Sequence, residues 1–499
     1  MKDFLCAERA DALESEIRRH PGYRLLRGIC GDDKIALLYK GCLSMSQEPH
    51  PPCRFPRLRL LAMPAWLFLK HLRNGRARKR IEALAAVPVL WGMFPDKDSQ
   101  KIAGVRRFND DGYLYGPHFK RGEVIHIFGD WNIPEPGRTE WKRNMDAMGI
   151  PWADRRDFGV NGRLLRLTLR TMRIVLRDIM RAPTAIPMGA ELWRATLKGL
   201  YHYLLKHYEI ENTDYRAEIV KNDYNPGHVA ATIAANQSGR KRLGVSHVSS
   251  AVDSPQICFV HFDRYATVCP MQEKWHGRFW RDLPIARTGK ESIDSIVEAK
   301  GRVTDIKRRL DAKHPKAHHT VTILFPGNAE RCLVPQWEKM YQGLQLGAAK
   351  FILDVRVFLR FRRLTEAMQV PHMAKIANLA SWYPKFICEH DDFTTHELMA
   401  ASDLVITANA SFGINEALVA GKAVFTFDYT LKAHQYFGPE YGKDFILTEP
   451  EHVERVFEAL GEGQWTQDVD WNRMRADADY HHDGRNRERL AQLAREMAG

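Results

Sequence analysis

The sequence predicts an α/β protein of at least two domains, in which helices cover parallel β-sheets. Three observations support this fold class. First, a chain of 499 residues is too long for one ordinary hydrophobic core. Second, residues 394–430 alternate helix, strand, turn, helix and strand, and the strands at 404–407 and 423–427 are apolar enough to be buried on both faces. Third, short apolar strands and helices alternate in the same way from residue 215 onwards.

The composition is that of a folded, basic protein. Hydrophobic residues make up 44% of the chain, and 74 basic against 61 acidic side chains give a net charge of +13. This charge favours anionic partners such as nucleotides, phospholipid surfaces or nucleic acid. Because no helix-turn-helix, RNA-recognition or zinc-finger pattern accompanies it, we do not expect a nucleic-acid partner.

The cysteines and the start of the chain favour a cytoplasmic location. The eight cysteines form no CxxC pair, which is typical of reduced thiols in a cytosol. The N-terminal segment is charged throughout and lacks the apolar core of a signal peptide. The longest apolar run, 60–69, is about ten residues long and contains Pro64, whereas a membrane-spanning helix needs roughly 20 residues.

Two predicted helices in the first half are rich in basic residues. We expect a polar helix over 3–19 and strands over 34–39, 87–93 and 124–128. The block 54–80 carries nine basic residues, no acidic ones, and interleaved apolar side chains. Such a block is typical either of an interfacial segment on an anionic membrane or of a core helix with a solvated basic end.

The second basic segment is more regular. Its arginines recur at spacings of three and four, which forms one continuous face on a helix: Arg163, Arg166, Arg170, Arg173, Arg177 and Arg181. Like charges at this spacing repel one another, so an anionic neighbour would stabilise the helix. This anionic neighbour would be phospholipid, a polyanionic acceptor or carboxylates of the same protein. Arg166, Arg170 and Arg173 are therefore candidates for a membrane or acceptor surface.

Beyond residue 215, two polar residues at strand ends are candidates for a general base. Asp223 follows one predicted strand and His247 follows the next. A histidine at the carboxyl end of a parallel strand can act as a general base or bind phosphate, although it can also be hydrogen-bonded within a loop. The strands are expected at 216–221, 242–246 and 264–268, with helices at 227–238 and 270–275.

The second half continues the alternation. We expect helices at 293–311 and 485–497, and strands at 319–325, 350–354 and 386–390. No GxxxxGK[ST] phosphate loop is present in the sequence. Two Asp-x-Asp patterns lie in a polar tail, and a tail of this polarity is usually solvated helix, so we expect no metal.

The turn at 408–411 lies between a buried strand and a helix, which places free backbone N–H groups and a positive helix end at the carboxyl edge of the sheet. Such an arrangement binds anions, usually phosphate. Ser411 can add a hydroxyl, and Glu416, about one turn further, can reach a sugar or ribose hydroxyl. The alternative is that Ser411 caps the helix and Glu416 is solvated.

The runs ASDLVIT and SFGINEALVAGKAVFTFD, at 401–407 and 411–428, resemble the C-terminal nucleotide-sugar domain of GT-B glycosyltransferases. Those that build bacterial surface polysaccharides, such as capsule, O-antigen or lipopolysaccharide, are the most similar. In that fold the donor diphosphate sits at this helix start, and an acidic residue in the helix holds the ribose or sugar. By this resemblance Ser411 and Glu416 match those places, with Phe412 and Gly413 on the same helix start.

Further donor-binding candidates are Asn328 and Arg331, in the loop after the strand 319–325, which can contact the donor phosphates, and His390, which can line the base pocket. The alternative is that Asn328 and Arg331 belong to a plain strand–helix loop and His390 to a solvated loop.

The resemblance covers about the last half of the chain and has consequences for the fold. It implies two Rossmann-like domains facing a cleft, with helical insertions in the first. We expect an acceptor-side domain over 1–284, a nucleotide-sugar domain over 285–465 and a polar helical tail over 466–499. A strand of the first domain ends in a His-Gly pair in these enzymes; here His247 is present, but Val248 replaces the glycine.

The function implied is transfer of a sugar from a nucleotide-sugar to a lipid-linked or polysaccharide acceptor in cell-surface glycan synthesis. His247 or Asp223 would deprotonate the acceptor. No cofactor or metal is expected, because the helix end and basic side chains offset the charge of the leaving diphosphate. We also expect a cytoplasmic protein, peripheral at the inner face of the plasma membrane. Two alternatives stay open: a CDP-polyol phosphotransferase of teichoic-acid-like polymers, and a non-catalytic scaffold in polysaccharide assembly.

Overall fold

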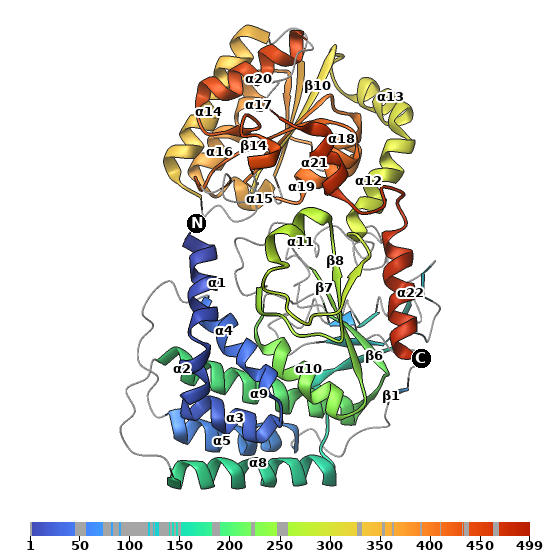
Figure 1. Cartoon of the computed structure of the whole chain (residues 1–499). Helices are drawn as coiled ribbons and strands as arrows, with labels where there is room; N and C mark the ends of the chain where they lie inside the picture. The colour runs from blue at the N-terminus through green and yellow to red at the C-terminus, as the bar shows by residue number, and fades with distance from the viewer. Residues whose placement is uncertain are drawn as a thin grey trace.

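The computed structural model describes residues 2–44, 56–72, 81–82, 89–90, 118–119, 123, 125–128, 139, 142–143, 146–147, 151–181, 190–220, 225–246, 258–326, 332–351, 355–361, 364–389, 392–409, 411–431, 433, 439–462 and 469–499. These residues form two lobes, and each is built on a parallel β-sheet covered by helices (Figure 1). The structure therefore confirms the α/β class and the two Rossmann-like domains.

All strand pairs in the described part of the chain are parallel. The first sheet has five strands in the order β2-β6-β7-β8-β9, and the second has six in the order β12-β11-β10-β13-β14-β15. Two further pairs, β1-β5 and β3-β4, are short. The strands of the N-terminal lobe are β1 (Ile81–Glu82), β2 (Val89–Leu90), β3 (His126–Phe128), β4 (Trp152–Asp154), β5 (Thr213–Asp214), β6 (Ala217–Val220), β7 (Lys241–Val245), β8 (Arg264–Thr267) and β9 (Ile285–Arg287). Those of the C-terminal lobe are β10 (His319–Leu324), β11 (Val355–Arg360), β12 (Phe386–Ile387), β13 (Leu404–Ala408), β14 (Ala423–Phe427) and β15 (Ile446–Leu447).

Helices surround both sheets. In the N-terminal lobe they are α1 (Lys2–Ala12), α2 (Glu14–Arg19), α3 (Pro21–Cys30), η1 (Asp33–Ile35), α4 (Ala36–Ser44), α5 (Pro56–Leu72), η3 (Arg155–Asp157), α8 (Gly162–Arg181), α9 (Ala190–Asn212), α10 (Gly227–Gln237) and α11 (Pro270–His276). In the rest of the chain they are α12 (Glu291–Gly301), α13 (Val303–Lys313), α14 (Val334–Phe351), α15 (Leu364–Ala367), α16 (Pro371–Ala377), α17 (Leu379–Trp382), α18 (Thr395–Ala401), α19 (Gly413–Val419), η8 (Pro439–Tyr441), α20 (Pro450–Glu462), α21 (Trp471–Ala478) and α22 (Asn486–Ala498).

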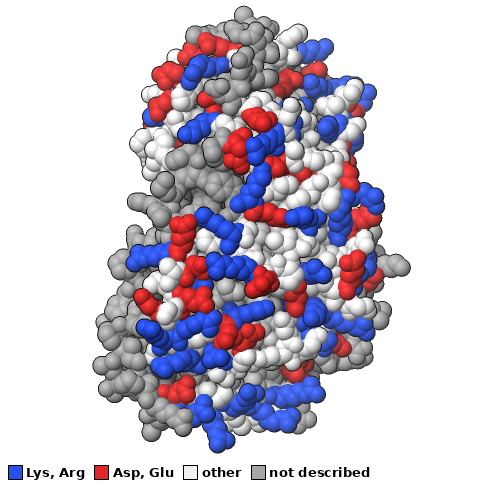
Figure 2. Space-filling view, in the orientation of Figure 1, with Lys and Arg blue, Asp and Glu red and all other residues white. Residues whose placement is uncertain are grey.

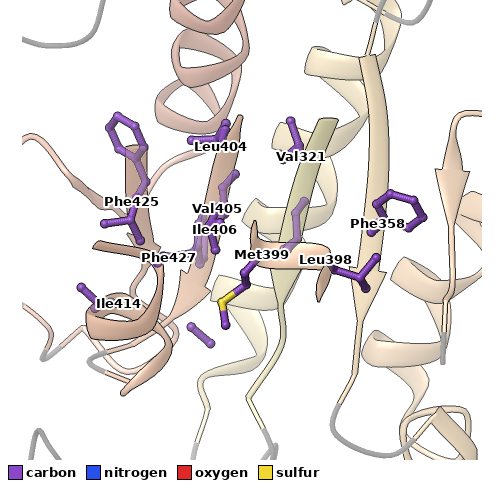
Figure 3. Close-up of a cluster of buried hydrophobic side chains, with 14 of the residues drawn as sticks. Val321, Phe358, Leu398, Met399, Leu404, Val405, Ile406, Ile414, Phe425 and Phe427 are labelled. Carbon is purple, nitrogen blue, oxygen red and sulfur yellow. The ribbon is translucent and has the colours of Figure 1, made fainter. Parts of the chain in front are cut away.

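The core of the C-terminal lobe is centred on β13 and β14, as the sequence predicts. The two strands pair in register from Leu404 opposite Ala423 to Ala408 opposite Phe427, and every side chain of both is buried. Figure 3 shows them among the apolar side chains of β10, β11, α18 and α19. Burial on both faces explains why these segments contain no charged residue. It also fixes where the turn between β13 and α19 lies.

One predicted strand is wrong. Residues 34–39 form η1 and the start of α4, because the Asp32 side chain accepts a hydrogen bond from the Lys34 N–H and the following apolar residues pack against α9. Of the strand predicted at 350–354, the first two residues belong to α14, and 352–354 lie outside the described residues. Short apolar runs fit both a strand and a buried helix, and packing decides between them.

The two lobes are joined by the chain at β9 and by the terminal helix. The expected boundary after residue 284 precedes β9, which pairs with β8, so the first sheet extends to Arg287. Helix α12 then enters the C-terminal lobe and packs against α18 and α19. At the other end of the chain, α22 returns to the N-terminal lobe and packs against β6 and β7 (Figure 1). The expected polar tail is therefore structural, and it covers the first sheet.

Candidate functional site

The turn after β13 lies at the carboxyl edge of the second sheet, next to the junction of the lobes (Figure 1). Asn409 adopts a left-handed backbone conformation with φ of 49°, and its Oδ1 accepts from the Tyr429 N–H at 2.8 Å, which ties the end of β13 to the end of β14. Gly413 opens α19, and a Cβ at this position would lie 2.9 Å from Leu324 Cδ1. The turn therefore packs closely on β10, and the Leu324 side chain would have to shift to admit a larger residue there.

Among the residues that the structure describes, no side-chain hydrogen bond caps α19. Ser411 contributes its backbone carbonyl, which accepts from the Ile414 N–H at 3.2 Å, and its hydroxyl is not the cap. The alternative reading, in which Ser411 serves only as a helix cap, is therefore not the observed geometry. The N–H groups of a helical first turn lack intrahelical acceptors, so this end of α19 can donate to an anion.

Glu416 is not a solvated helix residue, because only 13% of its side chain is exposed. His396, in the first turn of α18, lies with Nε2 3.4 Å from Glu416 Oε1 and can donate to it. Burial acts to raise the pKa of Glu416, but His396, the nearby Ser292 hydroxyl and the charge of Lys290 outweigh it and hold the pKa below its usual value. Glu416 is thus an ionised, oriented carboxylate with a small exposed surface.

Lys290 brings a positive charge to the same place from the junction between the lobes. It directly precedes α12, and its Nζ lies 4.1 Å from the centroid of the Phe412 ring. An ammonium above an aromatic face is attracted by the ring quadrupole. The turn at 411–413 therefore combines the N–H groups of a helix start, an aromatic ring and a nearby cation, and Glu416 lies one turn beyond.

Five of the predicted site residues lie outside the described residues: Asp223, His247, Asn328, Arg331 and His390. Their proposed roles stay predictions. The predicted residues that the structure does bring together are Ser411, Phe412, Gly413 and Glu416, on one turn and one helix. Arg166, Arg170 and Arg173 lie far from them, on the outer surface of α8 (Figure 1).

Sequence reasoning missed His396 and Lys290. His396 follows a capping box, in which the Thr394 hydroxyl accepts from the Glu397 N–H and the Glu397 carboxylate accepts from the Thr394 N–H. The Thr-x-x-Glu spacing was a readable signal for that helix start. No pattern in the sequence indicated that this helix start would face Glu416, because the two residues meet only through the packing of α18 on α19.

Several polar side chains near the junction of the lobes form hydrogen bonds and ion pairs that stabilise the fold. At the carboxyl end of β8, the Tyr480 hydroxyl donates to Glu273 Oε1 at 2.6 Å, and Arg287 forms an ion pair with the same carboxylate. Of the predicted Asp-x-Asp residues, Asp477 accepts from the Tyr441 hydroxyl at 2.7 Å. Asp479 accepts from the His482 N–H at 2.7 Å. These carboxylates hold α21 and the start of α22 in place.

Two negative findings concern only the part of the chain that the structure describes. Within it, no group of three or more His, Cys, Asp or Glu side chains is arranged to hold a metal ion. Every helix described there is too short or too polar to cross a lipid bilayer.

Comparisons with known proteins add fold-level similarities. No model of a known protein family matches the sequence, and no curated protein matches it. Among solved structures, the chain is similar to the wall teichoic acid polymerase TagF, with 11% identity and a TM-score of 0.47 over 89% of this chain and 98% of that one. It is similar to a glycosyltransferase from Rickettsia africae ESF-5, with 11% identity and a TM-score of 0.42 over 84% and 99%. A UDP-GlcNAc 2-epimerase from Neisseria meningitidis has 12% identity and a TM-score of 0.40 over 75% and 90%. At these values the similarities assign no activity, donor or acceptor.

Proposed function

We propose that the protein is a GT-B glycosyltransferase that moves a sugar from a nucleotide-sugar to a lipid-linked or polysaccharide acceptor at the inner face of the plasma membrane. One observation carries the proposal. The turn at 411–413 with the start of α19, the ionised Glu416 held by His396, and Lys290 all lie at the carboxyl edge of a Rossmann-like sheet. In sheets of this kind ligands bind at that edge.

The chemistry of these groups suits a nucleoside diphosphate. First-turn N–H groups and the Lys290 ammonium are donors and positive charges for phosphate oxygens. An ionised carboxylate can only accept hydrogen bonds, so Glu416 needs hydroxyl donors such as those of a ribose or sugar. His396 holds Glu416 Oε1, and the small exposed surface of the carboxylate is where a ligand hydroxyl would reach it. The donor would therefore lie along the first turn of α19, with its diphosphate at Ser411 and its hydroxyls at Glu416.

The proposed transfer step uses His247 or Asp223, which the sequence indicates and which lie outside the described residues. His247 or Asp223 takes the proton of the acceptor hydroxyl, and the oxygen attacks the anomeric carbon of the donor sugar. The bond between that carbon and the diphosphate oxygen breaks, and the nucleoside diphosphate leaves with the electron pair. The N–H groups of α19 and Lys290 stabilise the charge that develops on it, so no metal is needed for this role.

A panel of nucleotides in a thermal-unfolding assay tests the donor site. A ligand that binds the folded state raises the melting temperature by mass action. We expect one of UDP, GDP, CMP, CDP, ADP and dTDP to raise it, and Glu416→Gln to reduce that rise. The matched control is Glu298→Gln on the neighbouring α12, whose carboxylate is exposed and pairs with Arg302. It should leave the rise unchanged.

Turnover gives the second measurement. Glu416→Gln should lower turnover at least tenfold, which corresponds to about 1.4 kcal/mol of transition-state stabilisation. A rise with CDP alone, together with inert UDP- and GDP-sugars, would replace the proposal with a CDP-polyol phosphotransferase. If no nucleotide changes the melting temperature, the enzyme proposal fails and a scaffold role replaces it.

A further inference from the structure

Helix α8 lies at the end of the N-terminal lobe that is farthest from the C-terminal lobe (Figure 1). Its twenty residues span roughly 30 Å, and one side packs on α5, α3 and α9. Leu164, Thr168, Thr171 and Val175 are buried on that side. Figure 2 shows Lys and Arg side chains gathered at this end of the molecule. The opposite side of α8 faces outwards.

The outward side carries two stripes. Arginines form one, and at 3.6 residues per turn they fall within about 80° of the helix circumference: Arg163, Arg166, Arg170, Arg173 and Arg177. Leucines form the other, within about 40° and directly beside the arginines. The leucines are Leu165, Leu169 and Leu176, which are 42%, 57% and 50% exposed. A water-facing helix has no physical reason to expose a row of leucines, because each loses its hydrophobic stabilisation.

The charge on this side is almost uncompensated. Arg163 lies 3.6 Å from Glu211, and Arg177 lies 3.6 Å from its neighbour Asp178. Among the described residues, no carboxylate pairs with Arg166, Arg170 or Arg173. Within the described part of the chain, carboxylates therefore relieve the repulsion only at Arg163 and Arg177, and an external anion at the middle of the stripe would relieve the rest.

Helix α5, next to α8, also exposes apolar side chains. It packs against α8, and it exposes Trp66, Leu69 and Leu72 by 53%, 56% and 48%. Lys70 Nζ lies 5.4 Å from the centroid of the Trp66 ring. A tryptophan beside a lysine is typical of the interface between water and lipid headgroups, where the ring is half desolvated and the ammonium meets phosphate.

We propose that the outward sides of α5 and α8 form one surface that docks on an anionic phospholipid bilayer, with α8 lying in the plane of the headgroups. The arginine stripe binds lipid phosphates, and the leucine stripe with Trp66 enters the acyl boundary. This surface is separate from the donor site and does not depend on it. A soluble polyanion would use the arginines but leave the leucines and Trp66 in water, so the apolar exposure favours a bilayer.

Vesicle co-sedimentation tests the surface without any donor or acceptor. The full chain is mixed with vesicles of equal parts phosphatidylglycerol and phosphatidylcholine, or of phosphatidylcholine alone. We expect binding to the anionic vesicles only, with affinity decreasing as salt rises. The triple variant Arg166→Gln/Arg170→Gln/Arg173→Gln should bind about tenfold or more weakly. The double variant Leu169→Ser/Leu176→Ser should also bind more weakly, and most clearly at high salt.

A control variant and a second measurement, of tryptophan fluorescence, accompany the sedimentation experiment. Arg308→Gln/Trp382→Ser removes one exposed arginine and one exposed tryptophan from the other lobe and should bind as the unmodified chain does. Brominated lipids should quench the fluorescence of the unmodified chain more than that of Trp66→Phe. Equal binding by the arginine variant would overturn the proposal. Unchanged vesicle binding by the leucine variant, with full competition by soluble polyphosphate, would also overturn it in favour of a soluble polyanion.

Discussion

At the scale of single residues, we consider first a group of four charged side chains that is buried inside the N-terminal lobe. Lys206 on α9 lies between Glu209 and Glu218, and Arg242 on β7 donates from Nε to Glu218 Oε2 at 2.9 Å. Lys206 Nζ donates to the two oxygens of Glu218 at 2.9 and 2.8 Å. All four side chains are buried. Burial acts to raise the pKa of Glu218, but Arg242 and Lys206 outweigh it and hold the pKa below its usual value.

Removing the Glu218 carboxylate should lower the free energy of unfolding of the lobe. Glu218→Ala leaves Arg242 in the interior without its carboxylate and Lys206 with Glu209 alone, and breaking a buried pair in this way costs about 3–5 kcal/mol. We expect that loss in the free energy of unfolding measured with urea. Glu298→Ala breaks an exposed pair with Arg302 and should cost roughly 0.5 kcal/mol or less. Similar losses for both variants would contradict the role given to burial.

A buried histidine beside this group predicts a pH dependence of stability. His228 Nδ1 donates to the Asn225 carbonyl at 2.6 Å, and its Nε2 accepts from the His261 N–H at 3.2 Å, so the ring is neutral. Burial lowers the pKa of His228 to about 3, and the charge of Arg242 and the rings of His261 and His202 add to this, although the bond to Asn225 opposes it. Below a pH of about 6.5 the unfolded chain takes up a proton that the folded chain does not.

The stability that neutral His228 contributes is therefore complete above pH 6.5 and decreases as the pH falls. Between pH 7 and pH 5 the loss from one such histidine is roughly 2 kcal/mol. Urea unfolding at a series of pH values measures it, and His228→Gln should flatten the curve between pH 7 and pH 5. His202 and His261 have lowered pKa values as well, about 3 and about 4, so a residual slope should remain. An unchanged slope in His228→Gln would count against this assignment.

At the scale of elements, the start of α18 connects stability to the candidate site. The capping box of Thr394 and Glu397 fixes the first turn of the helix, and that turn carries His396. Arg309 on α13 donates from Nη1 to Glu397 Oε1 at 3.0 Å, so the same turn is held from a neighbouring helix. The orientation of the Glu416 carboxylate therefore depends on a cap that lies outside the site.

Thr394→Ala removes the hydroxyl that accepts from the Glu397 N–H. The expected cost is about 1 kcal/mol in the free energy of unfolding. Because His396 loses its fixed position, nucleotide binding should weaken as well, which the thermal panel would detect. Thr394→Ser keeps the hydroxyl and should restore both properties. Loss of stability without loss of binding would show that the cap does not position His396.

At the scale of the whole molecule, α22 holds the two lobes together. The Asp294 carboxylate on α12 accepts from the Asn486 and Arg487 N–H groups at 2.9 and 2.8 Å, which caps the start of α22. The Asn486 amide also donates to the Lys290 carbonyl at 3.1 Å. Gly289 adopts φ of 78° at this crossing, and a Cβ there would collide with the Asn486 side chain. The crossing that carries Lys290 to the candidate site is thus attached to the returning helix.

Gly289→Ala should loosen this attachment. A left-handed conformation is strained for alanine, and the added Cβ displaces Asn486, so the cost should be at least about 1 kcal/mol. Hydrogen exchange should become faster in residues 479–499 before it does so in the strands of either sheet. Gly301→Ala, at a helical position with open space around a Cβ, is the control and should change neither. Unchanged protection of α22 in Gly289→Ala would contradict the proposed attachment.

Local patterns in the sequence were sufficient for much of the fold. The apolar runs of β13 and β14 indicated buried parallel strands, because burial on both faces leaves no place for polar side chains. The spacing of arginines indicated α8 as one helix with a basic face. The strand–turn–helix pattern likewise placed Ser411 and Glu416 at the edge of the sheet. All three patterns could be recognised because each extends over only a few neighbouring residues.

Tertiary structure decided what depends on residues far apart in the chain. The apolar run at 34–39 fits a strand and a helix equally well, and packing against α9 makes it helical. His396 and Lys290 reach the Glu416 region only because α18, α12 and α19 pack together. The exposure of the leucine stripe on α8 likewise follows from which side of the helix its neighbours cover. The sequence by itself determined the elements and the chemical character of their edges. The packing between distant elements decided which side chains meet, because contact energies, unlike backbone propensities, are set by partners that no local window contains.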